Sequence, residues 1–177
     1  MKIECLKKFD LGISAKHIRS IPINMGNGRE GILFVYSADG GVDPGEEYYH
    51  HPTDTLKLAL FGLDGTRLWV KDLGEGVIPG IWFCPVLALD LDMDGVDEIY
   101  FLNNKNPRTP FSFVYRKLEA IDPNTGNTIG SWDWPKNTFN DRLSLSYRFY
   151  LAAGYSDGKP VLITSQGTYG DMYLQGY

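Results

Sequence analysis

The sequence predicts an all-β protein built from repeated antiparallel hairpins, and three observations support that prediction. Short segments rich in Val, Ile, Leu, Tyr and Trp are bounded by Asp-Gly and Thr-Gly turns, which is typical of strands. Glycine is abundant and aromatic residues make up 14% of the chain, a pairing that suits short strands and tight turns better than a helical bundle. The third observation is an internal repeat, which predicts how the strands are grouped.

The repeat is visible in residues that recur at a nearly constant spacing. Trp69 and Trp132 lie 63 residues apart, and Gly28, Gly95 and Gly158 follow one another at intervals of 67 and 63 residues. Each unit holds two hairpins, the first around an acidic or Gly-rich turn and the second around a tight turn such as PNTG. Four antiparallel strands that recur at this spacing predict the blades of a β-propeller.

In chain order, the repeats predict an incomplete propeller of about 2.5–3 blades. IECLKKFDLG (3–12) echoes TRLWVKDLG (66–74), so the first residues are expected to form a lone outer strand that clasps the last blade. Because closure takes typically four to eight blades, we expect an N-terminal part of a longer protein or one piece of an assembly, with the missing blades as partners. The expected units are 1–12 (outer clasp strand), 13–74 (first blade), 75–134 (second blade) and 135–177 (incomplete third blade).

An acidic loop, DLDMDGVDE at 90–98, precedes a predicted buried strand. Alternate spacing turns three of its carboxylates toward one point, and Gly95 permits the sharp turn between them. Oxygen ligands in that number suit Ca²⁺ and suit transition metals poorly. The loop is not an EF-hand, because Phe101 stands where that motif needs a bidentate Glu. The sequence therefore predicts a structural calcium site, formed by Asp90, Asp92, Asp94, the Val96 carbonyl and Glu98. The alternative is a solvated acidic turn without metal.

Composition and charge argue against several classes of partner. With 43% hydrophobic and 22% charged residues, the chain has the composition of a soluble globular protein. A net charge of −5 disfavours nucleic acid or an anionic membrane as the main partner. Cys5 and Cys84 lie far apart without metal-site spacing, which indicates unpaired or buried thiols. The N-terminus has no apolar core of signal-peptide length, which predicts a cytoplasmic location.

Candidate binding residues gather in the long connections of the predicted blades. In a four-stranded blade the tight first-to-second and third-to-fourth turns share one face, and the longer connections share the other. Aromatic rings that stack on sugars, beside cations that pair with uronate carboxylates, describe a carbohydrate surface. Two of the three histidines are adjacent on this face, whereas His17 is expected at the ordinary surface. The candidates are Tyr49, His50, His51, Trp82, Asn103, Asn104, Lys105, Arg108, Arg142 and Tyr169.

Residues 63–101, LDGTRLWVKDLGEGVIPGIWFCPVLALDLDMDGVDEIYF, resemble the propeller of rhamnogalacturonan lyases and the related ulvan lyases. In those families a DG-x-x-LW turn leads to DLG, then to a Gly-aromatic segment and a D-x-D-x-D-G-x-x-E calcium loop. The resemblance implies cleavage of an acidic polysaccharide, and relatives of this kind act outside the cell. One departure is clear, because the G-A-H-Y pattern of rhamnogalacturonan lyases becomes G-I-W-F here, with Trp82 in place of the histidine.

The implied chemistry is β-elimination at a uronate, which needs a group that neutralises the carboxylate, a base and an acid. The resemblance implies Arg108, supported by Asn104, as neutraliser, His51 or His50 as base, and Tyr169 as acid or alternate base. Two other interpretations remain open. One is a non-catalytic, calcium-stabilised propeller that binds glycan or protein. The other, suggested by the hairpin AIDPNTGNTIGSW alone, is a quinone-dependent dehydrogenase propeller.

Overall fold

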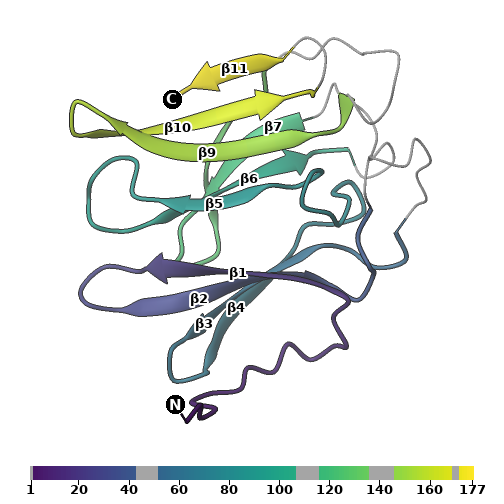
Figure 1. Ribbon diagram of the computed structural model, residues 1–177, viewed down its shortest axis with the longest axis vertical. Helices are drawn as coiled ribbons and strands as arrows, with labels where there is room; N and C mark the ends of the chain where they lie inside the picture. The colour runs from purple at the N-terminus through teal and green to yellow at the C-terminus, as the bar shows by residue number, and fades with distance from the viewer. Residues whose placement is uncertain (1, 43–51, 107–115, 136–145, 169–171) are drawn as a thin grey trace.

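The computed structural model describes residues 2–42, 52–106, 116–135, 146–168 and 172–177. Within these ranges, eleven strands form three antiparallel sheets of four, four and three strands, which are stacked in chain order from bottom to top in Figure 1. The first sheet holds β1 (His17–Asn24), β2 (Glu30–Ser37), β3 (Lys57–Gly62) and β4 (Arg67–Asp72). The second holds β5 (Val86–Leu89), β6 (Glu98–Asn104), β7 (Arg116–Ile121) and β8 (Thr128–Asp133). The third holds β9 (Phe149–Ser156), β10 (Lys159–Gln166) and β11 (Tyr173–Gly176).

The first strand of each sheet is its inner strand. Strand order follows chain order across every sheet, and β5 contacts both β1 and β9. These three strands lie together at the front of Figure 1, while the later strands of each sheet recede behind them. The arrangement is that of successive blades of an incomplete propeller-like fold, which confirms the predicted fold class. The three sheets span residues 17–72, 86–133 and 149–176, and the blade boundaries expected from the sequence stay a prediction.

The two central strands of the middle sheet, β6 and β7, are buried on both of their faces. In β6, Ile99 and Phe101 pack into a cluster shared with the first sheet, whereas Tyr100 and Leu102 pack into a cluster shared with the third. Successive side chains of a strand point to opposite faces, so one strand supplies both clusters. Each of these four side chains is at most 3% exposed. Burial of that extent contributes about 1.5–3 kcal/mol per large apolar side chain to the stability of the fold. It also explains why the sequence of β6 is a continuous apolar run.

The repeat recovered from the sequence has a structural counterpart in the turns. Gly28, Gly95 and Gly158, which recur in the sequence, lie in the turn that follows the inner strand of each sheet, with φ of 71°, 90° and 76°. Glycine adopts this left-handed region without the steric cost that a Cβ brings, so it is the favoured residue at each turn. The β3–β4 and β7–β8 pairs also share a register irregularity at corresponding places.

Residues 2–16 form no strand and lie against the first sheet. The Phe9 ring centroid is 5.2 Å from that of Phe34 and 5.7 Å from that of Phe61, on the face directed away from the second sheet. The clasp role of residues 1–12 therefore stays a prediction.

Both cysteines are free, Cys5 exposed and Cys84 buried. Within the described ranges, no helix is long and apolar enough to cross a membrane.

Candidate functional site

The tight turns of the first two sheets are joined at one edge of the molecule. The Asn24 backbone N–H donates to Asp97 Oδ2 at 2.7 Å, and the Asp97 N–H returns a bond to the Asn24 carbonyl at 2.9 Å. Arg29 Nη2 donates to Asn124 Oδ1 at 2.6 Å, which ties the β1–β2 turn to the β7–β8 turn. The opposite ends of the same strands therefore form a second edge, where the long connections begin and end.

The acidic loop lies at the tight-turn edge, between β5 and β6. Asp90, Asp92, Asp94 and Glu98 each offer one carboxylate oxygen, and these four oxygens lie within 4.8 Å of one another. The predicted convergence of the carboxylates is therefore confirmed, and the cluster can hold a metal ion. The participation of the Val96 carbonyl stays a prediction.

Backbone donors shape this loop around its carboxylates. Asp90 accepts hydrogen bonds from the N–H of Asp94 at 3.0 Å and of Gly95 at 2.9 Å, while Asp94 accepts from Val96 N–H at 2.8 Å. Met93 has a φ of 63°, which turns the chain back on itself at the tip of the loop. The carboxylates are thus held in place by the loop's own backbone.

Glu98 is the buried member of the cluster, with 8% of its surface exposed. Its Oε2 accepts from Leu91 N–H and from the Tyr100 hydroxyl, both at 3.1 Å. Burial raises the pKa of Glu98, and the charges of Asp92 and Asp94 raise it further, although the two hydrogen bonds act in the other direction. The ionised cluster is therefore costly by itself, and a cation among the carboxylates would offset that cost.

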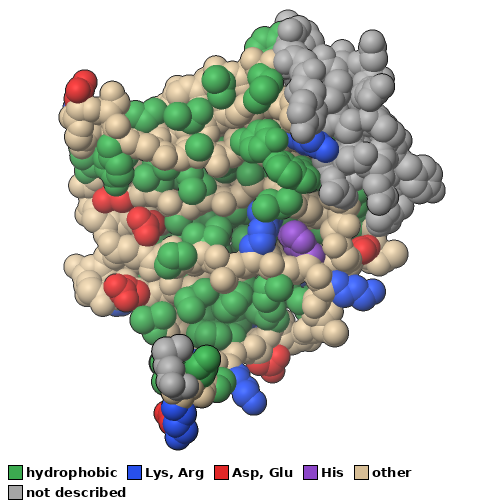
Figure 2. Space-filling model, viewed as in Figure 1, with side chains coloured by type: hydrophobic (Ala, Val, Ile, Leu, Met, Phe, Trp, Pro, Cys, Tyr) green, Lys and Arg blue, Asp and Glu red, His purple; other side chains and the backbone are tan. Residues whose placement is uncertain are grey.

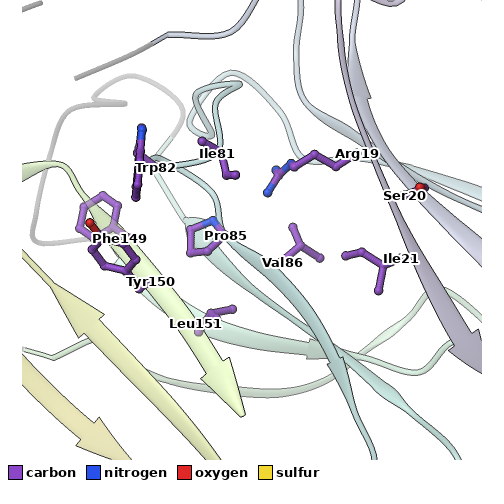
Figure 3. Close-up of a pocket in the computed structure, with 10 residues that line it drawn as sticks. All are labelled: Arg19, Ser20, Ile21, Ile81, Trp82, Pro85, Val86, Phe149, Tyr150 and Leu151. Carbon is purple, nitrogen blue, oxygen red and sulfur yellow. The ribbon is translucent and has the colours of Figure 1, made fainter. Parts of the chain in front are cut away.

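The three inner strands enclose a pocket of about 460 Å³ at the other edge (Figure 3). β1, β9 and the connection into β5 all contribute to it, and its lining is largely apolar. A pocket of this volume is in the range that holds small-molecule ligands. The lining residues are Arg19, Ser20, Ile21, Ile81, Trp82, Pro85, Val86, Phe149, Tyr150 and Leu151.

Arg19 is the charged residue of this pocket, and it is not among the site residues predicted from the sequence. Its Nη2 donates to the Cys84 carbonyl at 2.8 Å, but its Nε is buried and has no hydrogen-bond partner. Burial lowers the pKa of Arg19, and no ion pair joins it to any carboxylate in the described ranges. A signal was available in β1, because Arg19 has the same parity as Ile21 and Ile23 and so lies on the same, more buried face of the strand.

His17 is half-buried next to Arg19, which corrects the expectation that it lies at the ordinary surface. Figure 2 shows histidine and Lys or Arg surface side by side near the middle of one face, with hydrophobic surface around them. The Nε2 of His17 is buried without a hydrogen-bond partner. Burial, and secondarily the charge of Arg19, lower the pKa of His17, so the neutral imidazole is favoured.

Trp82 is the predicted substrate-binding residue that the structure places in the pocket. Its ring stands at 72° to that of Tyr150, with 5.2 Å between the centroids, and the Arg148 guanidinium lies 5.6 Å from the Trp82 centroid. Its carbonyl accepts a hydrogen bond from Phe149 N–H at 3.0 Å, which fixes the connection against β9. The half-buried indole thus presents an aromatic surface at a defined position.

Three other predicted substrate-binding residues stabilise the end of β6. The Lys105 ammonium contacts the Glu119 carboxylate, and Asn103 Nδ2 donates to Glu119 Oε2 at 2.8 Å. Glu119 is 1% exposed, so both side chains are directed at a buried acceptor. Asn104 is 5% exposed, and its Oδ1 accepts from Asn106 N–H at 3.1 Å. None of the three lines the pocket, and their role toward a substrate stays a prediction.

The remaining predicted site residues fall outside the described residues, so their positions are not assigned. Most of them belong to connections that leave β2, β6 or β10, and the described ends of these strands lie at the edge opposite the tight turns. The residues concerned are Tyr49, His50, His51, Arg108, Arg142 and Tyr169.

Comparison with known proteins gives a consistent result in sequence and in fold. No family model matches the chain. The rhamnogalacturonan endolyase YesW of Bacillus subtilis (strain 168) is 22% identical over 184 residues, which covers 86% of this chain and 28% of YesW. The chain thus spans less than a third of the length of the curated relative that it matches.

Solved structures of rhamnogalacturonan lyases share the fold. The Bacillus licheniformis rhamnogalacturonan lyase PL11 matches with a TM-score of 0.77 at 20% identity, over 93% of this chain and 32% of that one. The exotype rhamnogalacturonan lyase YesX matches with a TM-score of 0.77 at 20% identity, over 93% of this chain and 31% of that one. The predicted resemblance to rhamnogalacturonan lyases is confirmed, because the chain is similar in sequence and fold to one part of them. The resemblance to ulvan lyases stays a prediction.

Proposed function

We propose that this chain is part of a carbohydrate-active propeller that cleaves a uronate-containing polysaccharide by β-elimination. The observation that carries the proposal is that the sequence match over 86% of the chain and the fold match over 93% of it both lead to rhamnogalacturonan lyases. The partner is then an acidic polysaccharide or oligosaccharide. The net charge of −5 makes local cationic groups necessary, because the surface as a whole repels such a polymer.

In this reaction a base removes the proton at C5 while the bond from C4 to the leaving oxygen breaks. A cation or amide beside the C6 carboxylate makes that proton more acidic, and an acid protonates the departing oxygen. We assign neutralisation to Arg108, the base to His51 or His50, and the acid to Tyr169. Support comes from the strand ends that flank these residues, which lie at one edge of the sheets. Asn104 is better suited to holding the backbone near β6, because it is buried and bonded to Asn106.

We assign Ca²⁺ to the acidic cluster, in a structural role. Two exposed aspartates, one half-buried aspartate and a buried glutamate provide the hard oxygen ligands that Ca²⁺ prefers. The cluster follows the last residue of β5, whereas the pocket is reached through Pro85 and Val86 at the start of that strand. A cation there would hold the β5–β6 hairpin without contacting a ligand in the pocket.

The second candidate function is a non-catalytic, calcium-stabilised propeller that binds glycan or protein. Trp82 favours it, because an indole lines the pocket at the position where the pattern of rhamnogalacturonan lyases has a histidine. An indole stacks on a sugar but transfers no proton. Binding without cleavage is the outcome that such a substitution predicts.

The two functions are separated by a lyase assay paired with a binding assay. The purified protein is incubated with rhamnogalacturonan, with ulvan and with other uronate polymers, and absorbance reports the unsaturated product. A His50→Ala/His51→Ala double variant is expected to lose product formation while it still retards the polymer in affinity electrophoresis. Product formation at the wild-type rate by this variant would exclude both histidines as the base. Binding without product in the folded wild-type protein would favour the second function.

A further inference from the structure

The turn between β1 and β2 carries the one Asn-Gly dipeptide of the sequence, Asn27–Gly28 (Figure 1). Asn27 has a φ of 55° and Gly28 a φ of 71°, and the Arg29 N–H donates to the Gly26 carbonyl at 3.0 Å across them. Positive φ at both central residues is the type I′ geometry, for which Asn-Gly is a preferred sequence. Both residues are exposed, so the tip of this hairpin is open to water.

The Asn27 side chain and the Gly28 backbone are unhindered. Within the described ranges, no hydrogen bond holds the Asn27 amide or the Gly28 N–H. A Cβ added at Gly28 would meet no atom within 4 Å. Asn24, three residues earlier, differs on both counts, because its Oδ1 accepts the Gly26 N–H at 3.0 Å and the bulky Met25 follows it. Asn27 is therefore the asparagine of this hairpin whose side-chain carbon the next backbone nitrogen can approach.

An unhindered Asn-Gly dipeptide can deamidate without an enzyme, because glycine has no side chain to obstruct its own nitrogen. The Gly28 nitrogen attacks Asn27 Cγ and forms a succinimide ring. The Cγ–Nδ2 bond breaks, and Nδ2 leaves as ammonia with the proton of the Gly28 N–H. Water then opens the ring at one of its two carbonyls. Opening at Cγ yields aspartate, whereas opening at the main-chain carbonyl yields isoaspartate, and either product carries one new negative charge.

The same turn helps to join the first sheet to the second. Asn124 Nδ2 donates to the Met25 carbonyl at 3.3 Å, and Arg29 Nη2 donates to Asn124 Oδ1 at 2.6 Å. A Cβ at Gly26 would lie 2.8 Å from Val96 Cγ2, so the turn packs directly against the loop between β5 and β6. Isoaspartate would lengthen the backbone by a methylene group in the middle of these contacts. The new carboxylate would also compete with Asn124 for the Arg29 guanidinium, because charge-assisted hydrogen bonds are the stronger ones.

We propose that Asn27 is a site of spontaneous deamidation and that this modification weakens the joint between the first and second sheets. The reaction consumes only water and releases only ammonia, so it does not depend on the proposed function. Its rate rises with pH, because the deprotonated Gly28 nitrogen is the nucleophile. The stability of the joint would then decline with the age of the protein in neutral or alkaline solution.

The first test locates the modification. The native protein is incubated at mildly alkaline pH in parallel with a sample that is kept unfolded in urea. Trypsin cleaves after Arg19 and Arg29, and tandem mass spectrometry of the resulting peptide distinguishes an acid at Asn27 from one at Asn24. We expect Asn27 to lose its amide in the native protein at a rate within about tenfold of that in urea, since an exposed turn opens at little cost. Asn24 should keep its amide in the native protein.

The second test measures the joint. Ion exchange separates the modified protein, because it carries the additional negative charge. Its melting temperature should lie about 4–8 °C below that of the unmodified fraction, which corresponds to the loss of about two hydrogen bonds. Asn27→Gly is the matched control, because Gly-Gly also fits a type I′ turn but has no amide to lose. The melting temperature of this variant should not change during the incubation.

Three results would overturn the proposal. In the first, Asn27 keeps its amide in the native protein while the sample in urea loses it. In the second, the modified and unmodified fractions melt at the same temperature. In the third, the Asn27→Gly variant loses as much stability during the incubation as the wild type. None of these results depends on cleavage of a polysaccharide, so failure of this proposal is distinct from failure of the proposed function.

Discussion

Replacing Asp92 by Asn should have opposite effects on stability with and without calcium. Asp92 is an exposed member of the acidic cluster, and its Oδ1 accepts the Asp94 N–H at 3.1 Å. Asparagine retains an acceptor oxygen, so the substitution removes charge and leaves the turn its hydrogen bond. Without metal, the variant loses a repulsive carboxylate and becomes more stable. With calcium, it loses a ligand and becomes less stable.

The size of each effect follows from the distances in the cluster. Two unit charges 4.8 Å apart repel by about 0.9 kcal/mol in a water-like dielectric, and salt reduces this further. Asp92 faces three other carboxylates, so metal-free stabilisation of roughly 1–2 kcal/mol is expected. Calcium at a thousand times its Kd contributes about 4 kcal/mol to the wild type. The variant in calcium should therefore be less stable than the wild type by about 2–3 kcal/mol.

Thermal unfolding of the wild type and the variant, once in excess chelator and once in excess calcium, measures the predicted stabilisation without metal and the predicted destabilisation with calcium. One kcal/mol corresponds to roughly 2–4 °C in a domain of this size. Asp64→Asn is the matched control, because Asp64 bonds the Thr66 N–H in another hairpin turn and belongs to no acidic cluster. Its effect should be the same in both solutions. An Asp92→Asn variant that is stabilised equally in both solutions would identify the loop as a solvated acidic turn and refute the metal site.

Three further predictions concern the fold around the two edges. The pKa of His17 is lowered from its ordinary value of 6.5 by burial and by Arg19, so the unfolded chain takes up the proton first. Stability should then fall as pH decreases below about 6.5, and His17→Gln should flatten the melting temperature between about pH 7 and 5. Gly126→Ala should destabilise by about 1–2 kcal/mol or more in urea unfolding, because φ is +72° and the added Cβ would lie 3.0 Å from the Trp69 ring. Glu119→Gln should cost about 2 kcal/mol in the same assay, since it removes the buried charge that anchors two side chains at the end of β6; no change would show that the ion pair contributes nothing.

The fold was predictable because the repeat encodes turns as well as apolar strands. Gly28, Gly95 and Gly158 recur in the sequence, and all three adopt positive φ after an inner strand. Since glycine is favoured in such a turn, its spacing reports the spacing of the hairpins. The carboxylate cluster was predictable for the same local reason, because alternate residues in a short turn converge without any contribution from distant parts of the chain.

Contacts between segments far apart in the sequence were not predictable in this way. The segment 3–12 repeats the pattern of β4, yet it forms no strand, because a strand also needs a neighbour to accept its hydrogen bonds. Lys105 and Asn103 have the composition of a sugar-binding loop, but Glu119 on the adjacent strand orients both of them. Arg19 was missed because a single arginine in a strand carries no motif, and only the closure of three strands around it defines the pocket.

The acidic cluster and the pocket are connected through the shortest inner strand. β5 spans four residues, with Val86 in the pocket lining at its first position and the acidic loop directly after its last. A cation that holds the loop therefore restrains the only inner strand that contacts both of its neighbours within the described sheets. Arg19 donates a hydrogen bond to the Cys84 carbonyl, which lies just before this strand. A shift of β5 would therefore move the carbonyl that holds the Arg19 guanidinium in place. A cation bound at one edge would in this way influence the geometry of the pocket at the other edge without entering it.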